Sequence, residues 1–223
     1  MRVKGHGMWM VTAFLAAVCG ACGGGGSPVA PTPAPVVTTP APSPAGPATR
    51  GAVTDATDDT KPDDRVARSP DIGSAVVEVG TETVRVSVRF VPGTFSADTT
   101  SIEVHLDTDE NTATGLAGTS PAGDDRDRIG ADFLLLRTGI VPRLARDVLF
   151  ECTSRVFEQC ATVAQPTVTV VADGLDFTFA RSALHDDGRM AFKVLANVFI
   201  DFSQSDADVD VAPDTGLAAA PVR

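Results

Sequence analysis

From about residue 71 onward, apolar and polar residues alternate in the manner of β-strands. In Val84–Phe90, valine or phenylalanine occupies every second position, and Arg85, Ser87 and Arg89 lie between them. Because successive side chains of a strand point to opposite faces, this segment has one apolar and one polar face. Similar alternation or a short β-rich run predicts further strands at residues 75–79, 102–106, 133–136, 145–150, 155–163, 167–171, 175–179, 190–194 and 197–202.

Turn-forming residues separate these runs, for example Val91-Pro92-Gly93 and Ala172-Asp173-Gly174, and only residues 180–185 suggest a helical turn. Many short strands at such spacing predict an all-β fold, an antiparallel β-sandwich with jelly-roll-like connections. The continuously apolar run 133–136 predicts a central strand. An outer-membrane barrel is disfavoured because its girdles need Trp and Tyr, whereas this chain has no Tyr and its single Trp is Trp9.

Residues 1–21 have the organisation of a bacterial export signal. Arg2 and Lys4 precede an uncharged apolar run over residues 8–18, which is too short to cross a hydrocarbon core of roughly 30 Å. The following Gly20-Ala21-Cys22 resembles a lipoprotein signal, in which a small residue precedes the cysteine that receives the lipid; Cys19 departs from the usual leucine. This resemblance implies palmitate-type acylation of Cys22. An ordinary cleaved secretory signal is the alternative.

The segment after the signal predicts a tether. Residues 22–70 begin with a glycine run and continue with repeated proline, so they cannot bury a core and favour extended chain. We therefore expect a disordered tether over residues 22–70, a β-sandwich over 71–216 and a flexible tail over 217–223. Gly23 is not the aspartate of an inner-membrane retention signal, which slightly favours the outer membrane as the anchoring site within the cell envelope.

The charge balance restricts the partners. The 223 residues contain 18 Lys+Arg and 29 Asp+Glu, for a formal net charge of -11. A nucleic-acid binder needs a basic surface, so this class is excluded. Loss of residues 1–21 removes Arg2 and Lys4 and no acid, which leaves 16 − 29 = -13. A body this acidic is not attracted to anionic lipid headgroups, so the lipid chain itself must provide the membrane anchor.

Two cysteines remain inside the predicted sandwich. Cys152 and Cys160 are eight positions apart, and in an oxidising compartment such a pair predicts a disulfide. Closing this small loop would stabilise the fold by roughly 2.5 kcal/mol in the chain-entropy model. Two buried free cysteines on neighbouring strands are the alternative.

An acidic turn predicts a calcium site. Asp107, Asp109 and Asn111 follow a predicted strand at alternate positions, and hard oxygen ligands on a turning backbone are what Ca²⁺ prefers. The match to a helix–loop–helix calcium loop is only partial, since Thr112 stands where glycine is needed. Asp132 is the expected donor of the remaining charge. The alternative is a solvated acidic turn that caps its own backbone.

A second acidic string spans residues 206–214 and alternates like an exposed edge strand. Charges at such an edge discourage pairing between sheets, and a second ion is the less favoured interpretation.

Candidate catalytic groups are few. Outside the signal the only histidines are His105 and His185, and no nucleophile elbow, zinc-protease motif or phosphate-binding loop occurs. We therefore expect no catalytic residue and no enzyme activity. A surface hydrolase with paired carboxylates, or its accessory domain, remains the alternative because acid pairs form in space rather than in sequence.

Several strings together resemble one kind of module. They are residues 106–115, 129–132, 182–188 and 210–216, and they are similar to bacterial extracytoplasmic β-sandwich domains related to DOMON and family 9 carbohydrate-binding modules. That resemblance implies a sugar or haem ligand. Sugar stacking prefers Trp and Tyr, which the mature chain lacks, and an axial haem pair could only combine Met190 with His105 or His185. The prediction is a non-catalytic binding or structural module for a glycan or protein ligand, with Ca²⁺ as its only cofactor.

Overall fold

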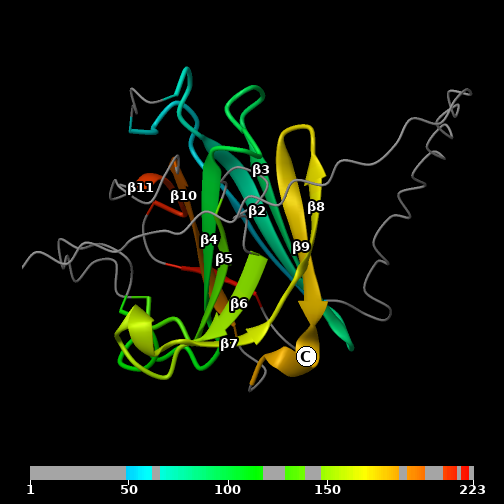
Figure 1. Cartoon of the computed structure of the whole chain (residues 1–223), viewed down its shortest axis with the longest axis vertical. Coiled ribbons are helices and arrows are strands. Elements are labelled where there is room, and N and C mark those ends of the chain that lie inside the picture. The colour runs from blue at the N-terminus through cyan, green and yellow to red at the C-terminus, as the bar shows by residue number, and fades with distance from the viewer. Residues whose placement is uncertain are drawn as a thin grey trace, which may run out of the picture. The chain divides into compact units, whose positions relative to one another are not determined.

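The computed structural model describes residues 49–61, 66–117, 129–138, 147–185, 190–198, 208–214 and 217–220. The predicted signal, the predicted lipidation site Cys22 and the tether up to residue 48 lie outside the described residues. The described part is an antiparallel β-sandwich of two packed sheets, and its helical elements are short 3-10 turns (Figure 1). The predicted all-β sandwich is confirmed.

The strands divide between a first and a second sheet. The first sheet has the order β1 (Thr49–Thr54), β2 (Ile72–Val79), β3 (Thr83–Phe90), β9 (Gly174–Ala180) and β8 (Thr167–Val171). The second has the order β11 (Asp208–Ala212), β10 (Ala191–Val198), β4 (Thr100–Asp107), β5 (Phe133–Arg137), β6 (Asp147–Glu151) and β7 (Ala161–Ala164), and β12 (Ala218–Ala219) also pairs with β10. The single-turn helices are η2 (Phe157–Gln159) and η3 (Arg181–Ala183).

The core lies between the sheets and follows from the alternation. In β3, Val84, Val86 and Val88 are fully buried, whereas the residues between them are half-buried. They pair in register with Phe179, Phe177 and Leu175 of β9, so one apolar row continues into the next strand. Burying an aliphatic or aromatic side chain of this size stabilises a fold by roughly 1.5–3 kcal/mol, so the alternation alone explains why these strands form a sheet.

The chain passes between the sheets at β3–β4, β7–β8 and β9–β10. Within the second sheet, β4, β5 and β6 form an antiparallel meander, with Leu106 opposite Phe133 and Phe133 opposite Glu151. These strands therefore meet at one end of the sandwich, which holds the C-terminal end of β4, the start of β5 and the C-terminal end of β6. Residues far apart in sequence meet there, which is where the acidic turn lies.

Both predicted boundaries of the sandwich are wrong. Strand β1 lies in residues expected to belong to the tether and pairs with β2 over its whole length. Strand β12 lies in the expected tail and pairs with β10. The two segments pack tightly, because a Cβ at Gly51 would lie 2.5 Å from the Ala219 carbonyl oxygen. Neither segment has a long apolar row. They join the sheets through backbone hydrogen bonding to β2 and β10, which composition does not reveal.

Other predicted elements shift slightly. Residues 190–194 and 197–202 were expected to be separate strands, but β10 is continuous from Ala191 to Val198 and is buried along its whole length. The predicted strand 155–163 is replaced by η2 followed by β7. The helical turn expected at 180–185 is present as η3, and β5 is an interior strand as predicted.

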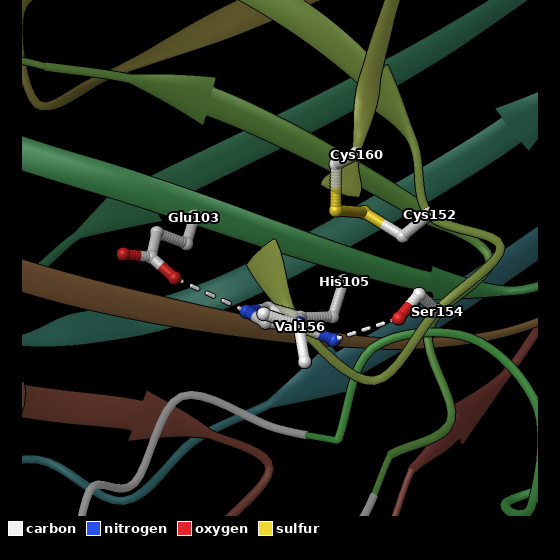
Figure 2. Close-up of a disulfide and its surroundings, with 6 residues drawn as sticks. All are labelled: Glu103, His105, Cys152, Ser154, Val156 and Cys160. Atoms are coloured by element: carbon white, nitrogen blue, oxygen red, sulfur yellow. Dashed lines mark hydrogen bonds and ion pairs between the residues drawn. A yellow bond between two sulfur atoms is a disulfide. The ribbon is translucent and has the colours of Figure 1, made fainter. Parts of the chain in front are cut away.

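A second, smaller apolar cluster covers the outer face of the second sheet. It consists of Leu116, Ile129, Ala131, Leu134 and Cys152, all nearly inaccessible to solvent. His105, expected on a polar face, is also fully buried, and its Nε2 lies 3.2 Å from Glu103 Oε2 (Figure 2). This sheet is thus covered on both faces near the acidic turn.

Candidate metal site

Three carboxylates meet where β4 ends and β5 begins. Asp107 is the last residue of β4, Asp109 follows in the turn, and Asp132 directly precedes β5. One oxygen from each lies within 4.8 Å of the others. Because β4 and β5 are antiparallel neighbours, the fold itself brings Asp132 to the turn 25 residues earlier in the chain.

Asp107 is buried, and no described basic side chain forms an ion pair with it. Its residue is 1% exposed, and neither carboxylate oxygen has a hydrogen-bond partner. Burial, and after it the negative charge of Asp132, raises its pKa to about 6, against a smaller opposing effect of the Glu110 backbone. Burying a carboxylate is unfavourable unless a charge or hydrogen bonds compensate it, so this side chain lacks a partner that its position requires.

The other two aspartates are held by the local backbone. Asp132 Oδ2 accepts hydrogen bonds from the backbone N–H of Thr108 at 2.9 Å and from its hydroxyl at 2.8 Å. Asp109 Oδ1 accepts from the Asn111 N–H at 2.8 Å, and both Asp109 oxygens contact the Thr114 hydroxyl. These contacts hold the two carboxylates in place.

Asn111, the fourth predicted ligand, is placed differently. Its side-chain oxygen accepts a hydrogen bond from the Ala113 N–H at 3.1 Å and forms an Asx turn on the exposed surface. The structure therefore brings together Asp107, Asp109 and Asp132 and uses Asn111 to shape the turn.

Two glycines permit the close approach of the acidic turn to the segment before β5. Gly115 and Gly130 have φ angles of +58° and +66°, which side chains with a Cβ rarely adopt. A Cβ at Gly115 would lie 2.4 Å from the Ala131 carbonyl oxygen, and one at Gly130 would lie 2.5 Å from Thr112 Cα. An isolated bridge between Leu116 and Ala131 completes the junction.

The disulfide supports the same turn. Cys152 and Cys160 are bonded, as predicted, with Cα atoms 4.3 Å apart (Figure 2). Inside the loop that they close, Arg155 donates hydrogen bonds to the Thr112 and Ala113 carbonyl oxygens at 3.1 and 3.3 Å. The loop closed by the disulfide therefore contacts the acidic turn through the Arg155 guanidinium.

An open pocket of about 330 Å³ adjoins the aspartates. It is lined by Thr108, Asp109, Thr114, Gly115, Asp132, Phe133, Glu151, Cys152, Thr153 and His185. His185 Nε2 lies 3.7 Å from Glu151 Oε1, and the His185 side chain is 77% exposed. Sequence reasoning missed Glu151, although its place at the end of a strand antiparallel to β5 is the kind of signal that could have found it. Asp186 and Asp187, beside His185 in sequence, lie outside the described residues.

The residues considered for haem do not meet. Met190 packs in the core between the sheets, whereas His105 alternates with the core residues Val104 and Leu106 and therefore faces the opposite side of its sheet. His185 stands on the pocket rim.

Comparison of the chain with protein-family models, curated proteins and solved structures gives no match. Among the described residues, no helix has the length and apolar character needed to cross a membrane.

Proposed function

We propose that the protein is a lipid-anchored, extracytoplasmic β-sandwich that acts as a non-catalytic binding or structural module and is stabilised by Ca²⁺. The observation that carries the calcium assignment is Asp107, a fully buried carboxylate with no partner on either oxygen, beside two further carboxylates. We infer that the partner of this carboxylate is a bound cation rather than a group of the polypeptide.

The donor set suits calcium. Asp107, Asp109 and Asp132 supply hard oxygen ligands, and the adjoining open pocket admits water oxygens to complete the shell. Ca²⁺ accepts six to eight oxygens in flexible geometry, whereas Mg²⁺ demands a near-ideal octahedron. The ion would join the end of β4, the acidic turn and the entry to β5, and would offset the mutual repulsion of the three carboxylates.

The calcium assignment is tested by thermal unfolding of the full chain with CaCl₂ and with chelator. At a free calcium concentration 100 times Kd, stabilisation is about 2.7 kcal/mol, so we expect a melting temperature several degrees higher with calcium. Asp107→Ala and the exposed Asp109→Ala should reduce this difference strongly, whereas Asp98→Ala, an exposed acid elsewhere, should leave it unchanged. Identical melting in calcium and chelator would remove the metal from this account.

The anchor is proposed from the sequence of the N-terminus. Cys22 would carry the acyl chains, and the proline-rich segment would hold the acidic sandwich away from the bacterial envelope surface. Labelling cells with a palmitate analogue should mark the protein, and Cys22→Ser should abolish the label. A wild-type protein that remains unlabelled would exclude lipid anchoring.

The ligand class follows from the resemblance to DOMON and family 9 carbohydrate-binding modules. We propose an extracellular glycan or a protein of the envelope as the partner. Pull-down on immobilised glycans and peptidoglycan, with and without calcium, tests this directly. Retention on a glycan that is lost in chelator would support binding at the pocket beside the aspartates.

A surface hydrolase is the second candidate, because the pocket gathers Asp109, Asp132 and Glu151 next to His185. A two-carboxylate mechanism requires such a concave acidic site. If the pocket is catalytic, the protein should cleave chromogenic glycosides, and Glu151→Gln should abolish cleavage while leaving the melting temperature within a degree or two. Absence of cleavage across a broad panel would favour the binding module.

A further inference from the structure

A second cluster of carboxylates lies at another edge of the sandwich. It consists of Asp59, in the connection between β1 and β2, Asp71, which precedes β2, and Asp210 of β11 in the opposite sheet. One oxygen from each lies within 4.8 Å of the others. The cluster therefore combines residues beside β2 of the first sheet with a residue of β11 in the second sheet.

Within this cluster, Asp71 has a buried carboxylate oxygen without a hydrogen-bond partner. Its residue is 3% exposed, its Oδ2 accepts a hydrogen bond from the Asp58 N–H at 2.9 Å, and its Oδ1 is buried with no partner. Asp58 has a positive φ of 66°, so the backbone turns to present that N–H. An orphaned oxygen in a nearly inaccessible carboxylate requires a cation or a donor at that point.

Asp210 is held in place from two directions. Its Oδ2 accepts from the backbone N–H of Ile72 in the other sheet, and its Oδ1 accepts from its neighbour Val211 at 2.9 Å. The residue is 5% exposed although β11 is an edge strand. The sequence predicts a solvated charge here, and the structure instead directs this carboxylate inward, towards Asp71.

Among the described residues, the carboxylates around this cluster repel one another and form no ion pair with a basic side chain. Burial, together with the negative charges of Asp210, Asp214 and Asp59, raises the pKa of Asp55, which directly follows β1, to about 7. Burial, with smaller contributions from Asp59 and Asp71, likewise raises the pKa of Asp210 to about 6, although the Ile72 and Val211 N–H groups lower it. No ion pair joins these five carboxylates to a Lys, Arg or His within the described ranges.

We propose that Asp59, Asp71 and Asp210 form a second site for a hard divalent cation of the Ca²⁺ class, which clamps the β1–β2 connection to β11. The site is separate from Asp107, Asp109 and Asp132 and does not depend on the proposed function. The ion would link the β1–β2 connection of the first sheet to β11 of the second sheet, close to β1, the first described strand.

Calcium stoichiometry tests this proposal. Isothermal titration calorimetry of the full chain with CaCl₂ should detect two ions per chain. Asp109→Ala should leave one ion, Asp59→Ala should leave one ion or raise the second Kd at least about tenfold, and the double variant should bind none. Asp59 and Asp109 are both exposed, so neither substitution disturbs the core, and Asp98→Ala serves as the matched surface control.

A local measurement separates the second site from the first. In the Asp109→Ala background, calcium should slow hydrogen exchange in residues 55–61 and at the Ile72 amide, and adding Asp59→Ala should remove this protection. A single ion in the wild type that Asp109→Ala eliminates would overturn the second site and leave the first intact. Unchanged stoichiometry in Asp59→Ala and Asp71→Asn would overturn it as well.

Discussion

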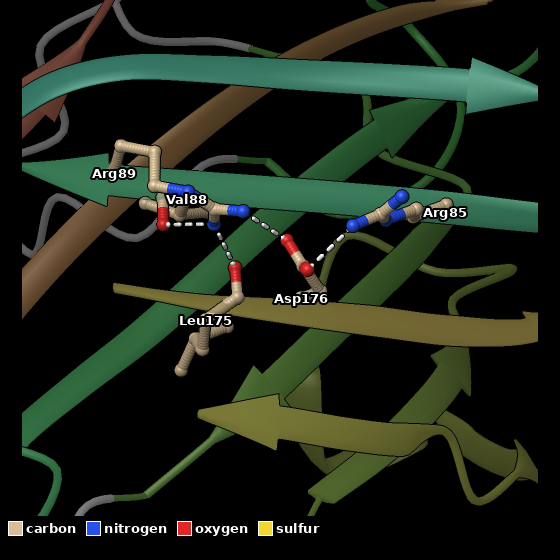
Figure 3. Close-up of polar contacts among 5 residues, drawn as sticks. All are labelled: Arg85, Val88, Arg89, Leu175 and Asp176. Carbon is tan, nitrogen blue, oxygen red and sulfur yellow. Dashed lines mark hydrogen bonds and ion pairs between the residues drawn. The ribbon is translucent and has the colours of Figure 1, made fainter. Parts of the chain in front are cut away.

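Asp176 and Asp107 are both nearly buried carboxylates on strands of the sandwich, but the chain treats them in opposite ways. Asp176, on β9, receives Arg85 on one oxygen and Arg89 on the other, each at 2.6 Å (Figure 3). Burial by itself would raise the pKa of Asp176, but hydrogen bonds from Arg85, Arg89 and Ser87 lower it overall. Asp107 has no such donors, and its pKa is raised to about 6.

The difference shows how this fold handles buried charge. On the first sheet, two arginines from the neighbouring strand complete a polar cluster within the polypeptide, and Arg89 also donates to the Leu175 carbonyl oxygen at 2.9 Å (Figure 3). At the ends of β4 and β5 in the second sheet, three acids converge, and no arginine among the described residues forms an ion pair with them. The charges of the first cluster are balanced within the polypeptide, whereas for the second we propose that a cation supplies the balancing charge.

The largest expected effect is at the completed cluster. Asp176→Asn leaves two guanidinium groups without their shared carboxylate, and we expect a loss of about 2–3 kcal/mol, since the partners are one-third exposed and partly rehydrated. The loss should be the same in calcium and in chelator, as measured by chemical denaturation. A loss that depends on calcium would break the distinction between the two clusters.

The same substitution at the incomplete cluster should have the opposite sign. In chelator at pH 8, Asp107→Asn removes a buried, unpaired charge and should stabilise the apo protein by about 1–2 kcal/mol. In calcium it should destabilise relative to wild type, because a ligand is lost. Destabilisation in chelator would show that Asp107 already has a partner within the chain.

The pH dependence should separate the two aspartates. The folded pKa of Asp107 is raised, so its contribution to stability is present below the unfolded value and is lost as pH rises through about 6. The folded pKa of Asp176 is lowered, so its contribution is present above the unfolded value and is lost as pH falls through the folded one. In chelator, wild type should lose about 1 kcal/mol relative to Asp107→Asn between pH 5 and pH 8. Relative to Asp176→Asn, it should lose stability only under acid conditions, and denaturation at each pH measures both.

The smallest effect is at the arginines. Arg85→Lys keeps the charge but reduces the number of aligned donors, and the side chain is 33% exposed, so a loss of about 0.5 kcal/mol is expected. Arg89→Lys should have a somewhat larger effect because the Arg89 guanidinium also bonds the Val88 and Leu175 carbonyl oxygens. Equal losses would mean that these backbone contacts contribute nothing.

Much of the site was predictable where the signal is local. The alternation at Val84–Phe90 has a period of two, which places its valines on one buried face, and the Asp107-x-Asp109 spacing identifies a turn with convergent oxygens. Asp132 was also predicted, as the donor of the charge that the acidic turn by itself does not supply. The role of Asn111 was not, since its side-chain oxygen can serve either a ligand or the Ala113 N–H, and only the folded turn decides between them.

The sequence by itself indicated a β-sandwich, the apolar core face of strands such as β3 and a disulfide between Cys152 and Cys160 as the favoured pairing, because these properties follow from neighbouring residues. Only the tertiary structure decided that β1 and β12 belong to the sheets, that Asp107 loses contact with water and that Asp210 turns inward to Asp71. Edge pairing and desolvation depend on which distant segments pack together, and no short window of sequence contains that information.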